Sequence, residues 1–201
     1  LRGRFWTILL AFLGAVRGGD VEEAAGLLAF LRATVNTARQ TRSRATPVYS
    51  AAEFGCLELV RLLAELGADV ETPGEGGATP AYIAALKGHV EVVRLLAELG
   101  ANVETPTNDG CTPAYVAAHQ GHVEVVRLLA ELGANVETPT HNGATPAWIA
   151  AYQGHLEVLR LLAELGANVN TPTNGGATPA CIAALFGHVE VVRLLAELGA
   201  N

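Results

Sequence analysis

The sequence has few basic residues beyond its first 45 positions, and this scarcity limits what the chain can bind. Residues 46–201 contain six Lys and Arg side chains against seventeen Asp and Glu, a formal charge of −11, whereas residues 1–45 carry a charge of +4. Affinity for nucleic acid depends on basic side chains that neutralise phosphates. We therefore expect no nucleic-acid partner for the larger part of the chain.

Cysteine is also scarce. The three cysteines, Cys56, Cys111 and Cys181, are an odd number and stand at three different places in the sequence pattern. Structural disulfides form between paired cysteines in oxidising compartments. The cysteine content therefore favours an intracellular protein, cytoplasmic or nuclear.

The apolar run near the N-terminus is too short for a membrane helix. It covers residues 5–16, which are 12 residues behind Arg2 and Arg4, whereas a helix needs about 20 residues to cross a bilayer. Two interpretations remain: the apolar core of a signal peptide, or a buried helix of an irregular first repeat. We favour the buried helix, because the residues that follow still match a repeat, and we expect no membrane partner.

That repeat is the main feature of the sequence. The unit begins at five threonines with a constant spacing of 33 residues, namely Thr46, Thr79, Thr112, Thr145 and Thr178. Self-similarity at one fixed period is typical of stacked repeat proteins, in which each unit contacts only its neighbours. The sequence therefore predicts five units in residues 46–201, the last one truncated. Residues 1–45 are interpreted as an irregular capping unit with a basic loop.

Within each unit, the residue types predict two short helices and a projecting loop. In the second unit, the hydroxyl of Thr79 can cap a helix, Pro80 suits its first turn, and Gly88 can end it. The second helix should span about residues 90–99, with its polar side chains on one narrow stripe. Asn-Asp-Gly at positions 108–110 is turn chemistry, and the flanking Val and Thr residues suit short strands. We therefore predict a β-hairpin finger after each helix pair.

Three motifs recur in this order in most units: T-P-x-x-x-A-A, G-H-x-E-V-V-R-L-L and G-A-N-V. Together they resemble the ankyrin repeat, and the resemblance covers residues 46–201. It implies a mainly α fold, a solenoid of stacked helix-turn-helix units with β-hairpin fingers. It also implies a protein partner, which we expect on the concave face formed by the first helices and the fingers.

The units depart from the family pattern at two places. The third and fourth residues of the common T-P-L-H opening are Ala-Tyr in two units, then Ala-Trp and Ala-Cys, which suggests that the aromatic ring fills core volume beside the alanine. In the second helix, Ala97 stands where a third leucine is usual, and Leu99 follows. Either Leu99 and its equivalents compensate in the core, or they form an exposed stripe.

No arrangement of residues in the sequence predicts catalysis or metal binding. Four histidines recur once per unit, namely His89, His122, His155 and His188. Stacked helices lie about 8–10 Å apart, whereas the ligands of one ion lie about 2 Å from it, so these histidines cannot share a metal. The repeated Glu and Arg columns predict a solvated face. We expect no enzyme activity, no cofactor and no small-molecule substrate.

The units differ from one another mainly at the ends of the first helices and at the finger tips. Two interpretations remain: a surface adapted to one partner, which we favour, or drift at exposed positions. Under the first interpretation, the candidate partner-binding residues are Asn108, Asp109, His119, Gln120, His141, Asn142, Tyr152, Gln153, Leu185 and Phe186. The sequence thus predicts a monomeric, non-enzymatic scaffold for a protein partner. The alternatives are a regulatory or targeting segment of a larger enzyme or channel, and a structural spacer.

Overall fold

The computed structural model describes residues 7–8, 11, 26, 29–30, 36 and 45–200. The predicted capping unit and basic loop in residues 1–45 therefore lie almost wholly outside the described residues. Within residues 45–200 the chain forms five helix pairs. The first helices are α3 (Pro47–Glu53), α5 (Pro80–Lys87), α7 (Pro113–Gln120), α9 (Pro146–Gln153) and α11 (Pro179–Leu185). The second helices are α4 (Leu57–Glu65), α6 (Val90–Glu98), α8 (Val123–Glu131), α10 (Leu156–Glu164) and α12 (Val189–Glu197).

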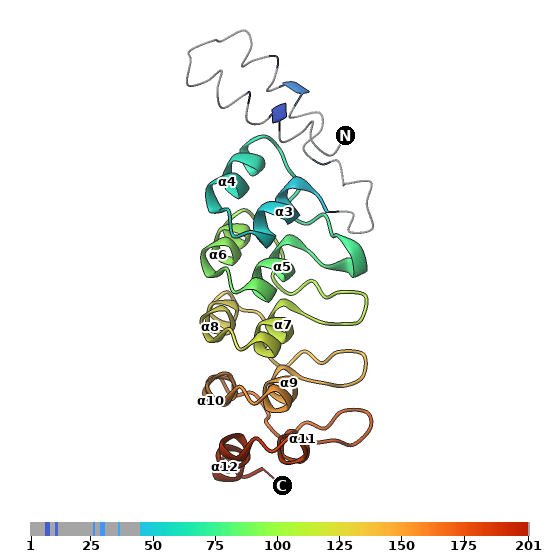
Figure 1. Ribbon diagram of the computed structural model, residues 1–201, viewed down its shortest axis with the longest axis vertical. Coiled ribbons are helices and arrows are strands. Elements are labelled where there is room, and N and C mark those ends of the chain that lie inside the picture. The colour runs from blue at the N-terminus through green and yellow to red at the C-terminus, as the bar shows by residue number, and fades with distance from the viewer. Residues whose placement is uncertain are drawn as a thin grey trace.

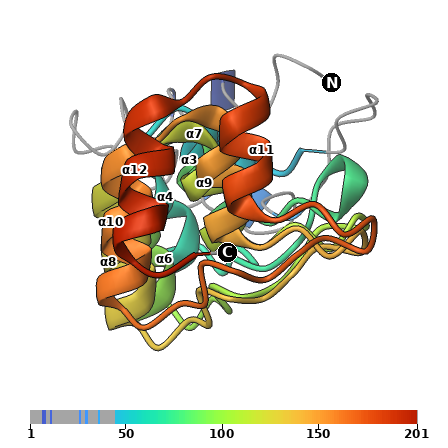
Figure 2. The same ribbon diagram turned by 90° about the horizontal axis from the view of Figure 1, so that it is seen from below.

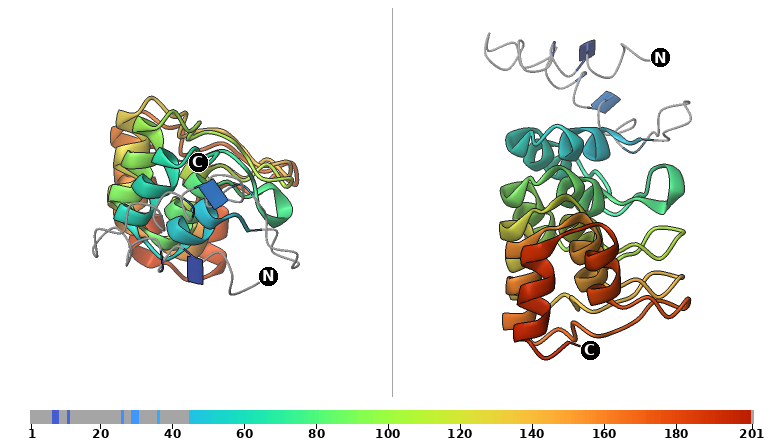
Figure 3. Two further views of the ribbon diagram at one scale, coloured as in Figure 1. Left: turned by 90° about the horizontal axis from the view of Figure 1, so that it is seen from above. Right: turned by 60° about the horizontal axis from the view of Figure 1, so that its bottom comes forward.

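The helix pairs stack in chain order into an elongated array (Figure 1). First helices contact first helices of the neighbouring units, and second helices contact second helices. The loops project from the side of the first helices, so the first helices lie between the loops and the second helices (Figures 1 and 3). This arrangement confirms the predicted solenoid of stacked helix pairs.

The ends of the first helices follow the chemistry of their sequence. In α7, the hydroxyl of Thr112 accepts a hydrogen bond from the backbone N–H of Tyr115 at 3.2 Å, and Pro113 occupies the first turn. The helix ends at Gly121, whose φ of +80° lies in the left-handed region that glycine tolerates best. Start and end are thus determined locally, and the same threonine cap recurs in all five first helices.

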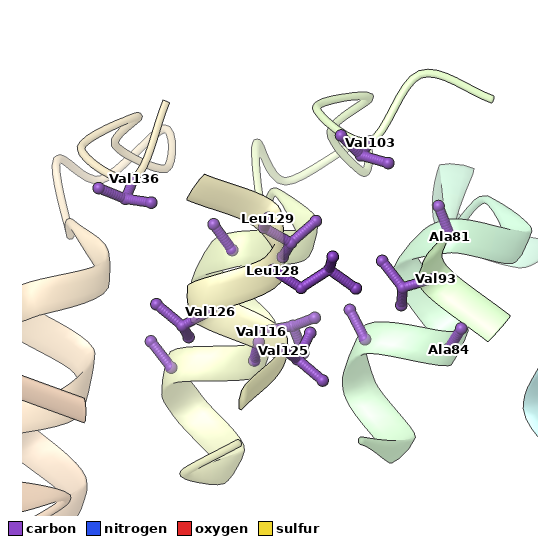
Figure 4. Close-up of a cluster of buried hydrophobic side chains, with 14 of the residues drawn as sticks. Ala81, Ala84, Val93, Val103, Val116, Val125, Val126, Leu128, Leu129 and Val136 are labelled. Atoms are coloured by element: carbon purple, nitrogen blue, oxygen red, sulfur yellow. The ribbon is translucent and has the colours of Figure 1, made fainter. Parts of the chain in front are cut away.

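The core consists of small side chains from the first helices and larger ones from the second helices. Ala117 and Ala118 of α7 are fully buried, as are Val126 and Leu129 of α8. Figure 4 shows Leu128 and Leu129 among side chains of the neighbouring units. The alanines let adjacent first helices approach closely, and the leucines fill the space between the two columns of helices.

The aromatic residues at the fourth position of the units lie at the edge of the core instead of inside it. Tyr82, Tyr115 and Trp148 are half-buried, and Cys181 is exposed. The alanine before each aromatic residue is fully or almost fully buried. These rings pack against the core from its edge, so the exchange of volume with the alanine stays a prediction.

The recurring histidines connect each unit to the unit before it. Nε2 of His155 hydrogen bonds to the backbone oxygen of His119 at 3.0 Å, and Nε2 of His188 bonds to that of Tyr152 at 2.9 Å. His89 and His122 make the equivalent bond. The imidazole ring of His155 also lies against Gly121: a Cβ added there would meet Cε1 of the ring at 2.9 Å. These histidines are structural links that hold the ends of the first helices in place.

The fingers are loops, and not the β-hairpins that the sequence predicts: residues 45–200 contain no strand. Each finger has few backbone bonds of its own, such as the bond from Thr107 N–H to the oxygen of Cys111 at 3.0 Å. Pro106 has no N–H with which to extend a ladder. The finger tips instead bond to one another, as Asn108 N–H does to the oxygen of Gly76 at 2.8 Å. Pairing between units therefore replaces pairing within a finger.

The leucine at the end of each second helix resolves the alternative that the sequence leaves open. Leu66 is 6% exposed, whereas Leu99 and Leu132 are 39% exposed and Leu165 and Leu198 are 42% exposed. Four of the five leucines thus form an exposed stripe. Among the described residues, no helix is both long enough and apolar enough to cross a membrane.

Replacement of Leu129 by Ala should lower the free energy of unfolding by about 2–5 kcal/mol, the usual range for a buried leucine. Leu129 is fully buried and packs within the array. The control is Arg127→Ala in the same helix, where the exposed Arg127–Glu124 pair at 3.8 Å should contribute less than about 1 kcal/mol. Urea denaturation measures both changes. Similar losses from the two variants would show that the helix faces are assigned wrongly.

A second pair of variants isolates the contact between histidine and glycine. Gly121 and Gly133 have similar positive φ values of +80° and +86°, but only Gly121 is covered by a histidine ring. Gly133→Ala should therefore cost only the backbone strain, about 1–2 kcal/mol. Gly121→Ala should cost about 1–3 kcal/mol more, because the new methyl group displaces His155. Equal changes in thermal unfolding would mean that this contact contributes nothing.

Candidate functional site

The candidate residues that the sequence predicts lie in two sets on one side of the array. The first set lies at the C-terminal ends of α7, α9 and α11, and the second set lies at the finger tips. Figure 2 shows the loops gathered beside the column of first helices. Candidates from different units therefore lie on one continuous side of the molecule.

Three rings form a cluster across the last two units, which we call the aromatic surface: Trp148, Tyr152 and Phe186. The rings of Trp148 and Tyr152 stack with their centroids 5.6 Å apart at an interplanar angle of 14°. The ring of Phe186 meets that of Tyr152 edge-on, with centroids 4.6 Å apart. Phe186 is 51% exposed, and its neighbour Leu185 is 75% exposed. Two of the predicted residues, Tyr152 and Phe186, thus lie in one cluster with a tryptophan that was not among the predicted site residues.

A shallow, open pocket of about 590 Å³ lies beside the aromatic surface. Its lining consists of residues from two finger tips and one helix: His141, Asn142, Trp148, Thr173, Asn174 and Gly175. Trp148 is held in position by a hydrogen bond from Nε1 to the backbone oxygen of Ala177 at 3.0 Å. Trp148 belongs to both features, so the pocket and the aromatic surface are continuous.

His119, Gln120 and Gln153 form a polar group at the ends of α7 and α9. The side-chain nitrogen of Gln153 lies 2.9 Å from Nε2 of His119, and that of Gln120 lies 3.0 Å from Nδ1. Burial, followed by the neighbouring His155, lowers the pKa of His119, which favours the neutral ring. A neutral imidazole accepts at one nitrogen and donates at the other, so only one of these two amide nitrogens can donate to the ring. These three predicted residues are therefore bound to one another.

The finger tips differ in how far their polar groups are available to a partner. The amide oxygen of Asn142 accepts hydrogen bonds from the hydroxyl of Thr140 and the N–H of Ala144, so it closes its own turn. Asn174 donates through Nδ2 to the oxygen of His141 at 3.0 Å. The exposed side chains of Asn108, Asp109 and His141 make no side-chain hydrogen bond within the described part of the chain. Asn142 is thus mainly a structural residue of its loop.

The half-buried aromatic column was overlooked by the sequence analysis. Tyr82 and Tyr115 precede Trp148 on the same side of the first helices, at intervals of one repeat. Burial, and next the nearby Cys111, raises the pKa of each of these two phenols to about 12. They are therefore neutral hydrogen-bond donors at physiological pH. The signal was present: the fourth residue of the unit varies between Tyr, Trp and Cys, but the variation was attributed to core packing.

The recurring histidines have a structural role and do not form a metal site. Each donates through Nε2 to a backbone oxygen of the preceding unit, as His155 does to His119. Within the described ranges, no three His, Cys, Asp or Glu side chains are grouped closely enough to hold a metal ion. The chemistry on this side of the array is therefore that of aromatic faces, amides and phenols, which suits binding through shape and hydrogen bonds.

Comparison with known proteins agrees with the fold. A family model of ankyrin repeats in three copies matches residues 73–140 and 132–201. A second model, of ankyrin repeats in many copies, matches residues 48–97. A search of curated proteins gave no match. The matched segments cover more than half of the chain, and the stacked helix pairs extend over the same residues. The chain therefore belongs to the ankyrin repeat family.

Proposed function

We propose that this chain is a non-enzymatic scaffold that binds a protein partner over the aromatic surface and the adjoining finger-tip pocket. Ankyrin repeats are generally modules for protein–protein interaction. The observation that carries the proposal is the continuous cluster of Trp148, Tyr152 and Phe186, in which two half-buried rings adjoin the exposed ring of Phe186. Exposed aromatic clusters are uncommon on proteins without a partner, and Trp and Tyr provide much of the binding energy in interfaces.

The surroundings of the cluster support this role, because they keep it rigid before a partner arrives. The backbone oxygen of Tyr152 is bonded to His188, and Nε1 of Trp148 is bonded to Ala177. Side chains that are already ordered lose little conformational entropy when they bind. The pocket beside them has room for one or two side chains of the partner. The first helices and fingers thus form the proposed binding face, which we take to be the concave one.

The composition of this face defines the partner that it suits. The aromatic surface and the pocket lining contain no charged carboxylate or ammonium group. A partner should therefore place an apolar or aromatic side chain against Phe186 and direct hydrogen-bonding groups to the finger tips. Asp109 and His141 lie at the rim, where they adjust specificity more than affinity.

We further propose that the chain acts as a monomer in a reducing, intracellular compartment. All three cysteines are free, and two of them, Cys56 and Cys181, are exposed. Exposed free thiols are readily oxidised outside such compartments. Burial raises the pKa of the third thiol, Cys111, which keeps it protonated and unreactive. This supports a structural role for Cys111 beside the tyrosines.

The replacement Tyr152→Ala should weaken partner binding by about 2 kcal/mol or more, as is typical of a central interface aromatic residue. A partner is first identified by affinity capture, comparing the natural chain with the variant as bait. Isothermal titration calorimetry then measures the dissociation constant for each. Because Tyr152 also packs on Trp148 and Phe186, Phe186→Ala serves as a second variant with less effect on packing.

The matched control for this experiment is Arg127→Ala on the exposed face of α8. It should leave the affinity within about 0.5 kcal/mol, as expected for a site outside the interface. All variants are first compared with the natural chain by circular dichroism and thermal unfolding. If Arg127→Ala loses affinity while Tyr152→Ala and Phe186→Ala do not, the partner binds the second helices and the proposed site is wrong.

A further inference from the structure

A second exposed surface lies at the C-terminal ends of the second helices, away from the aromatic surface. Each of α6, α8, α10 and α12 ends in the same three exposed residues, Glu, Leu and Gly. We call these the Glu-Leu-Gly turns, and they comprise residues 98–100, 131–133, 164–166 and 197–199. Their leucines are the four that are 39–42% exposed. Adjacent second helices contact one another, so the four turns form a row with one leucine and one carboxylate per unit.

This row is distinct from the aromatic surface. Phe186 ends α11, only three residues before α12 begins at Val189, whereas Leu198 stands at the other end of α12. A helix of nine residues is about 13 Å long. The Glu-Leu-Gly turns and the ends of the first helices are therefore separated by the full length of the second helices, and the row needs an explanation of its own.

The row of Glu-Leu-Gly turns carries negative charge that no basic residue in the last turn of a second helix compensates. The C-terminal end of a helix carries a partial negative charge from its unpaired carbonyl groups, and basic residues usually compensate it. None of the second helices has a basic residue in its last turn, and each has a glutamate there instead. Parallel helix ends with the same charge therefore concentrate negative potential along the row of exposed leucines.

In the first unit, the leucine of the corresponding turn is buried. Its leucine, Leu66, is 6% exposed. Asn36, from the N-terminal segment, donates through Nδ2 to the backbone oxygen of Gly67 at 3.4 Å and accepts from the N–H of Asp69 at 2.7 Å. The equivalent N–H groups of Asn102, Asn135 and Asn168 donate to glutamates of the preceding unit, so this bond recurs along the array and the turns differ in the exposure of the leucine. The glycines do not distinguish the turns: Gly67 and the glycines of the four other turns all have φ values between 79° and 91°, and a Cβ added at any of them would meet nothing within 4 Å.

We propose that the four open Glu-Leu-Gly turns are a docking surface for a basic, amphipathic helix of a partner protein. The charge selects this occupant. A second copy of the chain would bring its own glutamates against the row, and like charges across an interface are unfavourable. Lysine or arginine on a partner would compensate both the glutamates and the helix ends. Leucine or isoleucine on the same partner would cover the exposed leucines.

The spacing of the row favours a helix over an extended chain. Stacked helices lie about 8–10 Å apart, which corresponds to about five to seven residues of an α-helix, or just under two turns. A partner helix along the stack would therefore present one apolar residue per unit if these residues recur every seventh position. A partner in β-strand conformation would need an open strand edge with which to pair, and residues 45–200 contain no strand.

The test uses a synthetic helical peptide of about 28 residues, seven for each of the four turns, with leucine at every seventh position and lysine beside it. Fluorescence anisotropy measures its dissociation constant with the full chain. We expect it to bind at least about tenfold more tightly than a scrambled peptide of the same composition. Binding should weaken as salt is added, because charge complementarity is screened. Equal affinity of the scrambled peptide would overturn the proposal, since net charge alone would then explain binding.

Two double variants locate the peptide on the row. Leu132→Ser with Leu165→Ser should weaken binding by about tenfold, because two apolar contacts are lost. Glu131→Gln with Glu164→Gln should reduce the salt dependence of binding. Unchanged affinity and salt dependence in these variants would overturn the proposal.

The matched control is Phe54→Ser, which removes a side chain that is 72% exposed at the end of a first helix. It should leave peptide binding unchanged, and so should Tyr152→Ala, which separates this proposal from the proposed function. Loss of binding in Tyr152→Ala would place the peptide on the aromatic surface instead. A dimer in analytical ultracentrifugation that the leucine double variant dissociates would show that a second copy occupies the row, and this too would overturn the proposal.

Discussion

The structure depends on burial between neighbouring units, because no unit can bury its own apolar residues. A second helix of nine residues is too short to be stable alone in water. Val126 and Leu129 of α8 are nevertheless fully buried, since side chains of the adjacent units cover them. The polar contacts follow the same rule: the histidine bonds and the bonds between finger tips all join one unit to the next. Stability therefore arises at the junctions between units.

The same junctions position the surfaces that can bind. His188 fixes the backbone of Tyr152 in the preceding unit, and Trp148 bonds to Ala177 at the end of the finger of its own unit. The aromatic surface exists only because two units present their rings side by side. The row of Glu-Leu-Gly turns likewise exists only because identical helix ends are stacked. Both proposed binding surfaces are thus properties of neighbouring units, and a single unit contains neither of them in full.

Much of the local structure could be predicted from the sequence, because it depends on contacts only a few residues apart. The threonine cap, the proline in the first turn and the left-handed glycine at the helix end are all determined within one unit. The β-hairpin prediction was wrong because the fingers depend on contacts between units. Turn residues such as Asn108 and Gly110 indicated a hairpin, but Asn108 bonds to the preceding finger, and the spacing within one unit contains no information about that partner.

The sequence by itself determined the period of 33 residues, the helix pairs and the residues that vary between units, including Tyr152 and Phe186. Only the tertiary structure decided which of these residues meet. It placed Trp148 against Tyr152 in the aromatic surface, engaged the amide oxygen of Asn142 within its own loop, and left Leu99 and three of its equivalents exposed. The physical reason is that exposure and side-chain contact depend on how adjacent units cover one another, which the sequence of a single unit does not specify.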